Sequence, residues 1–318
     1  MSARKVDFSE IGSGGYTPGY VGMSGSGELS RRAGVLEERL SRCDLCPRGC
    51  GVDRNGGKTG YCGVDGRLKV AAINLHPWEE PPISGTGGSG TVFVSGCTLR
   101  CLFCQNYPIS QFGVGREMSA EYLASQMLRL QEKGAHNINL VTPTHQIAGL
   151  ARALDIAAKR GLRIPLVYNS SGYESVETLA VLDGIIDIYL PDIKYSDASV
   201  AQKFSGAADY VRRNRVALIE MWRQVGGIQT DSSGIARRGM IVRHMVLPED
   251  LAGTSECLSF LAREIGPGVW VSLMNQYFPA HRGVDTPPLD RKVSEEEYEA
   301  ACAALTGLGL INGFVQEC

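Results

Sequence analysis

Six short apolar runs that alternate with helical segments constrain the fold of this chain more than any other feature of its sequence. Runs rich in Val, Ile and Leu that end in Gly, Pro or polar residues are typical of strands buried on both faces. Strands that alternate with helices pair in parallel, and units of about thirty residues favour a curled sheet. The sequence therefore predicts an α/β fold, a partial (β/α)6 TIM-like barrel, with strands at residues 91–95, 138–142, 164–168, 185–190, 240–247 and 269–274.

Helical segments fill the intervals between these strands. Ser119 precedes one segment, and Ser294 precedes another that begins with three glutamates, so capping hydroxyls and acidic groups lie at the positive helix end. Gly134, Gly161 and Gly226 are natural stops, because glycine adopts the left-handed conformation that often ends a helix. We expect helices near residues 119–133, 146–160, 174–183, 207–225, 251–264 and 294–308.

Three cysteines, Cys97, Cys101 and Cys104, follow the first predicted strand with the spacing C-x3-C-x2-C. The run before them, residues 91–96, is apolar, β-branched and closed by glycine, which predicts that they lie on a loop at the strand's carboxyl end. Three thiolates can hold three irons of a 4Fe–4S cluster and leave the fourth iron open to a bound ligand. A zinc site would need a fourth protein ligand, and none is adjacent.

This loop, residues 97–106, resembles the cluster loop of radical SAM (S-adenosylmethionine) enzymes in Gly96, Cys97, Arg100, Cys101, Cys104 and Asn106. More narrowly, it is similar to the activases of glycyl radical enzymes, and to an uncharacterised subgroup of homologues of pyruvate formate-lyase activating protein. That subgroup carries Trp-Glu-Glu-Pro-Pro-Ile-Ser-Gly, found here at residues 78–85, and Asn-Ile-Asn-Leu-Val-Thr-Pro-Thr-His, found here at 137–145. The resemblance covers about residues 43–318.

The resemblance implies an enzyme with a 4Fe–4S cluster on Cys97, Cys101 and Cys104 and S-adenosylmethionine on the open iron. Reduced flavodoxin or ferredoxin would supply one electron, and the 5′-deoxyadenosyl radical formed would take a hydrogen atom from a substrate. Activation of a glycyl radical enzyme, a protein substrate, is the first reading. Radical SAM modification of a peptide or small molecule is the alternative, and a non-catalytic iron–sulfur electron carrier or scaffold is the third.

A second set of cysteines, Cys43, Cys46, Cys50 and Cys62, lies within twenty residues among Gly-rich turns. A segment of this size has too little apolar core to fold alone, so we interpret residues 43–66 as a metal-binding knot. An iron–sulfur cluster is favoured, and a structural zinc ion is the alternative. Residues 1–42 are expected to be a flexible arm with a short helix from Leu29 to Leu40, and residues 67–318 to be the radical SAM barrel.

Polar residues at the ends of the second and third strands are candidate contacts to S-adenosylmethionine, because chemistry in such barrels lies at the carboxyl ends of the strands. Thr142 and Thr144 stand where activases have Gly-Gly-Glu-Pro, and their hydroxyls can accept or donate hydrogen bonds. His145 is a candidate general base, with a capping or surface role as the alternative. The third strand ends in Asn169, Ser170 and Ser171, where activases have Asp-Thr-Asn-Gly.

The later strands add charged candidates. Asp192 and Lys194 resemble an activase Asp-Leu-Lys run and would contact the cofactor or a polypeptide substrate; a rim salt bridge is the alternative. Arg243 can bind the methionine carboxylate through two parallel hydrogen bonds, or be a buried structural arginine with an acidic partner. Gln276 and Tyr277 are expected at the mouth of the barrel.

Before the first strand, residues 76–83 carry several prolines and form an irregular belt toward the cluster loop. Glu79 and Glu80 in this belt either face the substrate or form a solvated turn. The formal charge of −2, from 32 basic and 34 acidic residues, gives no argument for nucleic acid. No apolar run approaches the ~18 residues of a membrane span, and no signal-peptide core is present, so we expect a cytoplasmic protein with no membrane contact.

Overall fold

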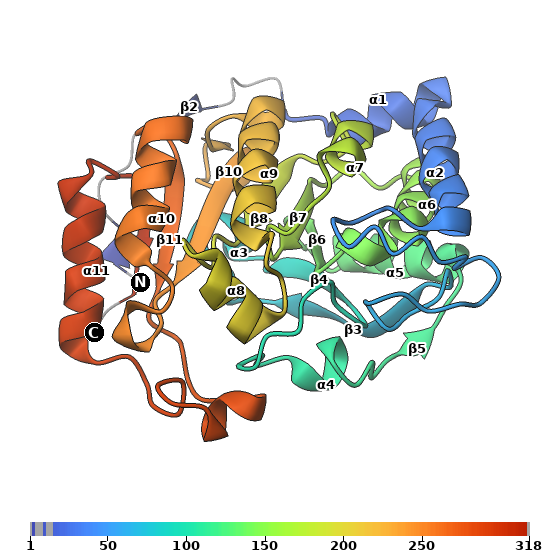
Figure 1. The fold of residues 1–318 in the computed structure, drawn as a ribbon. Helices are drawn as coiled ribbons and strands as arrows, with labels where there is room; N and C mark the ends of the chain where they lie inside the picture. The colour runs from blue at the N-terminus through green and yellow to red at the C-terminus, as the bar shows by residue number, and fades with distance from the viewer. Residues whose placement is uncertain (1, 4–8, 11–14, 317–318) are drawn as a thin grey trace.

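A curled, open sheet organises the computed structural model, which describes residues 2–3, 9–10 and 15–316. Figure 1 shows its strands as a curved row behind helices α6, α7, α9 and α10. Within the described residues, seven strands pair in parallel in the order β4-β6-β7-β8-β10-β11-β12. They are β4 (Ser89–Val94), β6 (Ile138–Val141), β7 (Leu166–Ser170), β8 (Ile188–Pro191), β10 (Ala236–Met245), β11 (Trp270–Met274) and β12 (Gly313–Val315).

The sheet does not close, because antiparallel strands extend it at both edges. At one edge β3 (Lys69–His76) pairs with β4 and with β5 (Arg116–Glu117), and at the other β1 (Ser2–Ala3) pairs with β12. A short ribbon of β2 (Ser9–Glu10) and β9 (Gln229–Thr230) pairs with β10. The predicted α/β partial barrel is thus confirmed, with all six expected strands present and β12 as a further parallel strand.

The helices follow the expected order. Ser119 accepts a hydrogen bond from the Tyr122 amide at the start of α5, and Ser294 forms a capping box with Glu297 at the start of α11. The expected helix at 207–225 is preceded by a separate one, because Gly206 ends α8 in the left-handed conformation. The helices are α5 (Ala120–Glu132), α6 (Ile147–Lys159), α7 (Val176–Val181), α8 (Ala198–Ser205), α9 (Tyr210–Val225), α10 (Thr254–Phe260), the π-helix η4 (Leu261–Ile265) and α11 (Glu295–Gly307).

Short helical turns lie in the connections, several of them at the strand ends. They are α3 (Pro81–Ser84), α4 (Tyr107–Ser110), η2 (Thr144–Gln146), η3 (Pro248–Asp250) and η5 (His281–Asp285). Among the described residues, no helix combines the length and apolar character needed to cross a bilayer.

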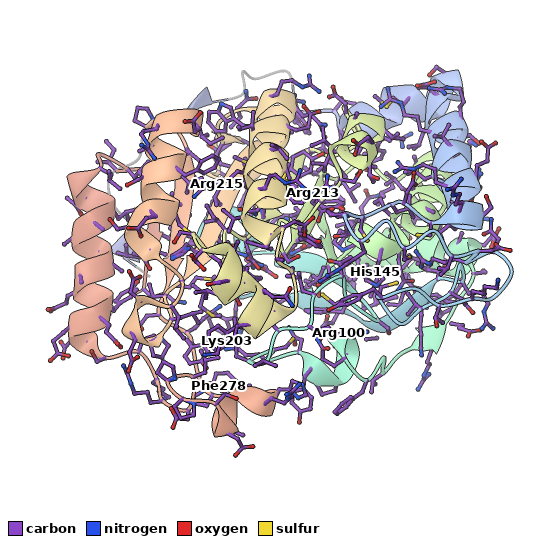
Figure 2. All side chains as sticks on the ribbon, in the orientation of Figure 1. Arg100, His145, Lys203, Arg213, Arg215 and Phe278 are labelled. Atoms are coloured by element: carbon purple, nitrogen blue, oxygen red, sulfur yellow. The ribbon has the colours of Figure 1, made fainter. Side chains whose placement is uncertain are left out.

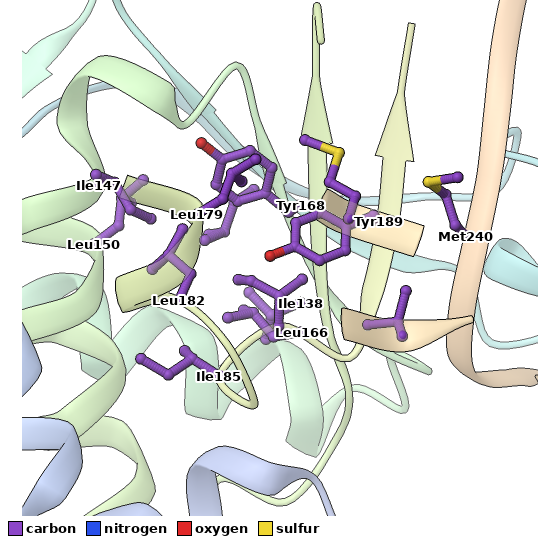
Figure 3. Packing of buried hydrophobic residues seen from close by; sticks show 14 of the residues in the cluster. Ile138, Ile147, Leu150, Leu166, Tyr168, Leu179, Leu182, Ile185, Tyr189 and Met240 are labelled. Carbon is purple, nitrogen blue, oxygen red and sulfur yellow. The ribbon is translucent and has the colours of Figure 1, made fainter. Parts of the chain in front are cut away.

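The core lies between the sheet and its helices. Figure 3 shows Leu166 and Tyr168 of β7 beside Tyr189 of β8, facing Leu179 and Leu182. These side chains are fully shielded from water, and each such burial contributes about 1.5–3 kcal/mol. The packed core fixes the strands, and so it also fixes the positions of the loops at their carboxyl ends.

The amino-terminal segment is more ordered than expected. Within the predicted arm, residues 19–26 form helix α1 (Gly19–Ser26), followed by α2 (Glu28–Glu38) and η1 (Arg39–Arg42). Tyr20 is completely buried, and its hydroxyl donates to the Ile164 carbonyl. Tertiary burial of this one aromatic side chain overrides the weak helix propensity of a Gly-rich segment. The rest of the predicted arm, residues 1, 4–8 and 11–14, lies outside the described residues.

Candidate functional site

A cavity of about 250 Å³ opens at the carboxyl ends of the parallel strands. We call it the cysteine cavity, because Cys97, Cys101 and Cys104 form one of its walls. Strands β6, β7, β8 and β10 supply the other walls, as expected for a barrel whose strand ends converge. Eleven of the residues predicted from the sequence meet here: Cys97, Cys101, Cys104, Thr142, Asn169, Ser170, Ser171, Asp192, Lys194, Arg243 and Gln276.

The cluster loop is held in place by the carboxyl end of α8. The Arg100 amide donates to the Ser205 carbonyl and the Leu102 amide to the Phe204 carbonyl. The Ser205 hydroxyl donates to the Cys101 sulfur at 3.0 Å, and Ser110 lies 3.1 Å from the Cys104 sulfur. Hydroxyl and amide donors to sulfur are among the features that tune an iron–sulfur cluster.

Thr142 marks the point where the chain leaves β6 toward the cavity. Its φ of 59° lies in the left-handed region, which is a rare and strained conformation for a β-branched residue. The strain is held by the sheet, since the Thr142 amide donates to the Asn169 carbonyl at 2.8 Å. Strain of this kind is typically kept where it serves a site, and Thr142 lines the cavity.

Asp192 is the centre of a charged network on the opposite wall. The Lys194 ammonium donates to one of its carboxylate oxygens at 2.6 Å, and the Arg243 guanidinium donates to the other at 3.1 Å. A second Arg243 nitrogen donates to the Asn169 side-chain oxygen at 2.7 Å. Asp192 and Lys194 form an ion pair, as in the predicted salt bridge. The pair also lines the cysteine cavity, where the sequence predicts a contact to the cofactor or substrate.

Burial and charge compete in this network. Burial alone would raise the pKa of Asp192, but the cations of Lys194 and Arg243 lower it below its ordinary value, so Asp192 stays ionised. Burial raises the pKa of the Cys97 thiol to about 12, and it also raises that of Cys101 against the opposing effect of Lys194. Metal binding to these thiols must therefore release protons.

A second cavity of about 320 Å³ adjoins the first. We call it the glutamate chamber, because Glu79 and Glu80 line it together with Trp78. Asn169 and Arg243 line both spaces, so the two are neighbours across these side chains. The carboxylate of Glu79 lies 3.7 Å from the Arg243 guanidinium. The belt of residues 76–83 thus brings both glutamates to the strand ends rather than to a solvated turn.

Three predicted residues lie away from the residues that line these cavities. Thr144 donates its hydroxyl to the buried carboxylate of Glu174 at 2.7 Å. His145 is buried with its Nε2 2.8 Å from the Ser95 carbonyl, and burial lowers its pKa to about 4, so the ring is neutral. Tyr277 donates its hydroxyl to the Leu289 carbonyl. The sequence predicts a general base at His145. In the structure its imidazole instead contacts the Ser95 carbonyl, and this contact positions the start of the cluster loop.

The cysteine knot packs directly against the cluster loop. Arg48 donates to the Thr98 carbonyl at 2.9 Å, and Arg100 donates back to the Tyr61 carbonyl. Arg54 is 2 % exposed and donates to the carbonyls of His145 and Asp65. Figure 2 labels Arg100 and His145, two of the barrel residues that receive the knot.

The knot cysteines themselves are neighbours. Cys43, Cys46 and Cys62 are buried, while Cys50 is exposed. Burial, and to a smaller extent the nearby sulfurs of Cys62 and Cys43, raises the pKa of Cys46 to about 12. In the described part of the chain, no three His, Cys, Asp or Glu side chains are gathered closely enough to hold a single metal ion. A multi-iron cluster spaces its ligands more widely, since each thiolate binds a different iron.

The model of one protein family, described as the radical SAM superfamily, matches residues 91–248, from β4 to the end of β10. The chain carries a radical SAM domain. This superfamily implies an enzyme of radical chemistry with a 4Fe–4S cluster and S-adenosylmethionine as cofactors. The matched region contains the cluster loop and the ends of strands β6, β7, β8 and β10.

Similar proteins extend beyond the radical SAM domain. An uncharacterized protein of Methanocaldococcus jannaschii, MJ0674, is 25% identical over 288 residues, which cover 86% of this chain and 77% of the relative. A second from the same organism, MJ0808, is 29% identical over 176 residues, or 50% of this chain and 51% of that one. The crystal structure of HydG, a maturase of the [FeFe]-hydrogenase, aligns with a TM-score of 0.48 and 12% identity, over 68% of this chain and 48% of that one.

The residues of the cysteine cavity fit both cofactors of a radical SAM domain. Three thiols share one wall, and among the described residues no fourth cysteine lines the cavity, so these thiols would bind three irons of a cluster and leave one open. The facing wall offers amide, hydroxyl, carboxylate and guanidinium groups, which suit the amino and carboxylate groups of an amino-acid cofactor.

Sequence reasoning missed three polar residues near the cysteines. Ser205 and Ser110 contact cluster-loop sulfurs, and Glu174 lies buried on the side of the knot. Ser110 was within reach, since it follows Cys104 by six residues. Ser205 lies 104 residues from Cys101, and only the tertiary structure brings them together.

Proposed function

We propose that this protein is a radical SAM enzyme that cleaves S-adenosylmethionine reductively in the cysteine cavity and abstracts a hydrogen atom from a substrate beside it. The observation that carries the proposal is the single cavity lined by three loop cysteines and by polar groups from four successive strand ends. When bound, the cluster and S-adenosylmethionine supply a one-electron cleavage to methionine and a 5′-deoxyadenosyl radical, which takes a hydrogen atom from the substrate.

The chain's own residues would divide the work of binding and orientation. Cys97, Cys101 and Cys104 would hold the cluster. Lys194 places a positive charge near Cys101, which favours the thiolate form that binds iron. The strained Thr142 and the side chains of Asn169, Ser170 and Ser171 would contact the cofactor, as would Gln276.

Arg243 supports the proposal in a different manner from the one first expected. Its guanidinium already binds Asp192 and Asn169, which is the structural alternative for a buried arginine. Arg243 also lines the cavity, and its third nitrogen lies 3.7 Å from the Glu79 carboxylate, which is longer than a hydrogen bond, so that nitrogen can hold a carboxylate while the side chain stays fixed. We propose that Asp192 orients Arg243 and that Arg243 contacts the carboxylate of S-adenosylmethionine.

Two substrate classes remain candidates. The likeness of the cluster loop to glycyl-radical-enzyme activases favours a backbone glycine of a partner protein. The glutamate chamber favours a different peptide or a small molecule, because a glycine loop offers no charge to match buried carboxylates. We propose a flavodoxin or ferredoxin as the source of the electron in either case.

The test is product formation in oxygen-free protein. We expect reconstituted enzyme, reduced with dithionite or with flavodoxin, to convert S-adenosylmethionine to 5′-deoxyadenosine and methionine in equal amounts, measured by chromatography. A non-catalytic iron–sulfur carrier would be reduced and would form no 5′-deoxyadenosine, and that result would overturn the proposal.

For the knot, we propose a second iron–sulfur cluster on Cys43, Cys46, Cys50 and Cys62. The four neighbouring cysteines, three of them buried, support it. A structural zinc ion is the alternative. Iron, sulfide and zinc analysis of protein isolated without oxygen separates them, because two clusters require about twice the iron of one.

A further inference from the structure

The glutamate chamber contains a buried carboxylate that has one oxygen without a hydrogen-bond partner among the described residues. Glu80 is 4 % exposed, lines the chamber, and its Oε2 has no hydrogen-bond partner among the described residues. A buried ionised group normally requires an opposite charge or hydrogen bonds, and leaving it without them costs stability. Such a group in the wall of a cavity points to a ligand that supplies the missing interaction.

The cations nearby are already engaged. Lys194 binds Asp192 at 2.6 Å, and Arg243 binds Asp192 at 3.1 Å while its other nitrogens face Asn169 and Glu79. The three carboxylates of Asp192, Glu79 and Glu80 therefore face two cations across the two cavities. The chamber lining also contains the half-buried imidazole of His76. Arg243 acts on Glu80 only through its charge, and burial raises the pKa of Glu79 to about 7, so among the described residues Glu80 is the chamber carboxylate to which a cation from outside can bind directly.

The rest of the chamber suits an organic cation. The side-chain amide oxygens of Asn169, Gln276 and Gln316 each accept one hydrogen bond within the protein and keep a second lone pair for an N–H group. Trp78, in the belt of residues 76–83, lies at the rim of the chamber. Its large aromatic side chain is 81 % exposed. An exposed indole attracts an ammonium or guanidinium group to its face, so it offers a first contact on the way to Glu80.

We propose that the glutamate chamber binds a cationic amine or guanidinium group of the substrate, with Glu80 as its direct partner and Glu79 beside it. This rests on the proposed function, because it places the substrate next to Asn169 and Arg243, where the chamber meets the cysteine cavity. The cation has two sources, a Lys or Arg side chain of a peptide or a free polyamine, and the chemistry at Glu80 is the same for both.

Calorimetry on the anaerobically reconstituted full chain, with S-adenosylmethionine present and no reductant, tests binding apart from turnover. The probes are acetyl-Gly-Lys-Gly-amide, its uncharged counterpart acetyl-Gly-norleucine-Gly-amide, and spermidine. We expect a cationic probe to bind at least ~10-fold more tightly than the norleucine peptide, as for one charge-assisted hydrogen bond. The lysine peptide as the tighter cation identifies a peptide substrate, and spermidine identifies a free amine.

The variant Glu80→Gln has the same shape and should lose that ~10-fold preference, whereas Glu132→Gln, an exposed control on α5, should keep it. Equal binding of charged and uncharged probes to the native protein overturns the proposal without any variant. So does a Glu80→Gln protein that binds S-adenosylmethionine less well but keeps its cation preference, since the carboxylate would then serve the cofactor. The proposed function fails separately, through absence of 5′-deoxyadenosine.

Discussion

The two cysteine clusters lie against each other and yet differ in what surrounds them. The loop cysteines 97, 101 and 104 are half-buried and face a cavity whose other walls carry charged and polar groups. In the knot, Cys43, Cys46 and Cys62 are buried, and arginines fasten the segment to the barrel by their bonds to backbone carbonyls. The difference indicates that the loop cysteines have room for a ligand beside them, whereas most of the knot cysteines are packed against protein.

Two buried carboxylates show the same contrast. Asp192, near Cys101, lies between two cations, which lower its pKa against the effect of burial. Glu174, on the side of the knot, has hydroxyl partners in Thr144, Tyr168 and Ser170, and burial raises its pKa to about 7. The cavity side stabilises the ionised carboxylate of Asp192, whereas burial on the knot side favours the neutral form of Glu174.

The largest expected effect separates the chemistry of the two clusters. Cys101→Ala removes one of three ligands, and we expect 5′-deoxyadenosine formation to fall at least ~1000-fold, equivalent to about 4 kcal/mol. Cys50→Ala in the knot should retain a rate within ~10-fold per folded molecule, since we propose that the knot cluster has a structural role. If Cys50→Ala falls as far as Cys101→Ala, the knot takes part in electron transfer and the contrast breaks. Cys302→Ala, outside both clusters, is the control.

For stability we expect the opposite ranking of the two sets of cysteines, with the larger loss for the knot. We expect Cys46→Ala, or removal of the metal proposed for the knot by a chelator, to lower the free energy of unfolding by ~4 kcal/mol, because metal binding would supply the folding energy of a segment without its own core. Urea unfolding under oxygen-free conditions measures it, with Cys101→Ala as the matched variant. Unchanged stability after loss of the knot metal would mean that the knot folds without it.

The contact between knot and barrel gives a smaller effect. Arg54→Met keeps the volume of the side chain but leaves the carbonyls of Asp65 and His145 without their donor. We expect a loss of ~3 kcal/mol of stability, measured by urea unfolding. Arg67→Met, directly after the knot, removes exposed ion pairs only and should cost at most ~1 kcal/mol. Equal losses for the two variants would contradict a buried anchor at Arg54.

From the sequence alone, the residues that line the cysteine cavity could be predicted better than the residues that hold its loops in place. Parallel strands converge at their carboxyl ends, so Asn169, Asp192 and Arg243 could be placed together from strand positions alone. Thr144 and His145 could not be placed in this way. The chain reverses at Thr142 in a left-handed conformation, which turns the next residues toward Glu174 and Ser95.

Other features were hidden for different physical reasons. Strand β12 has three residues, too few for a periodic signal to stand out. Helix α1 contains three glycines and forms because Tyr20 finds a buried position against the barrel, which is a tertiary effect. The second cavity depends on a proline-rich belt whose path no local pattern specifies, so Glu79 and Glu80 could not be assigned to it.

The smallest expected effect concerns pH on the knot side. Glu174 has an ordinary pKa of 4.5 and a folded pKa of about 7, so between these values the folded protein binds more protons than the unfolded chain. Stability must then fall as the pH rises through this window, by at most ~2.5 kcal/mol between pH 5 and pH 8, and level off above it. Glu174→Gln has no such titration, so its unfolding free energy should change less between pH 5 and pH 8 than that of the native protein. Urea unfolding at both pH values measures the difference, and an identical slope would show that Glu174 is ionised in the folded state, with the two sides of the molecule treating charge alike.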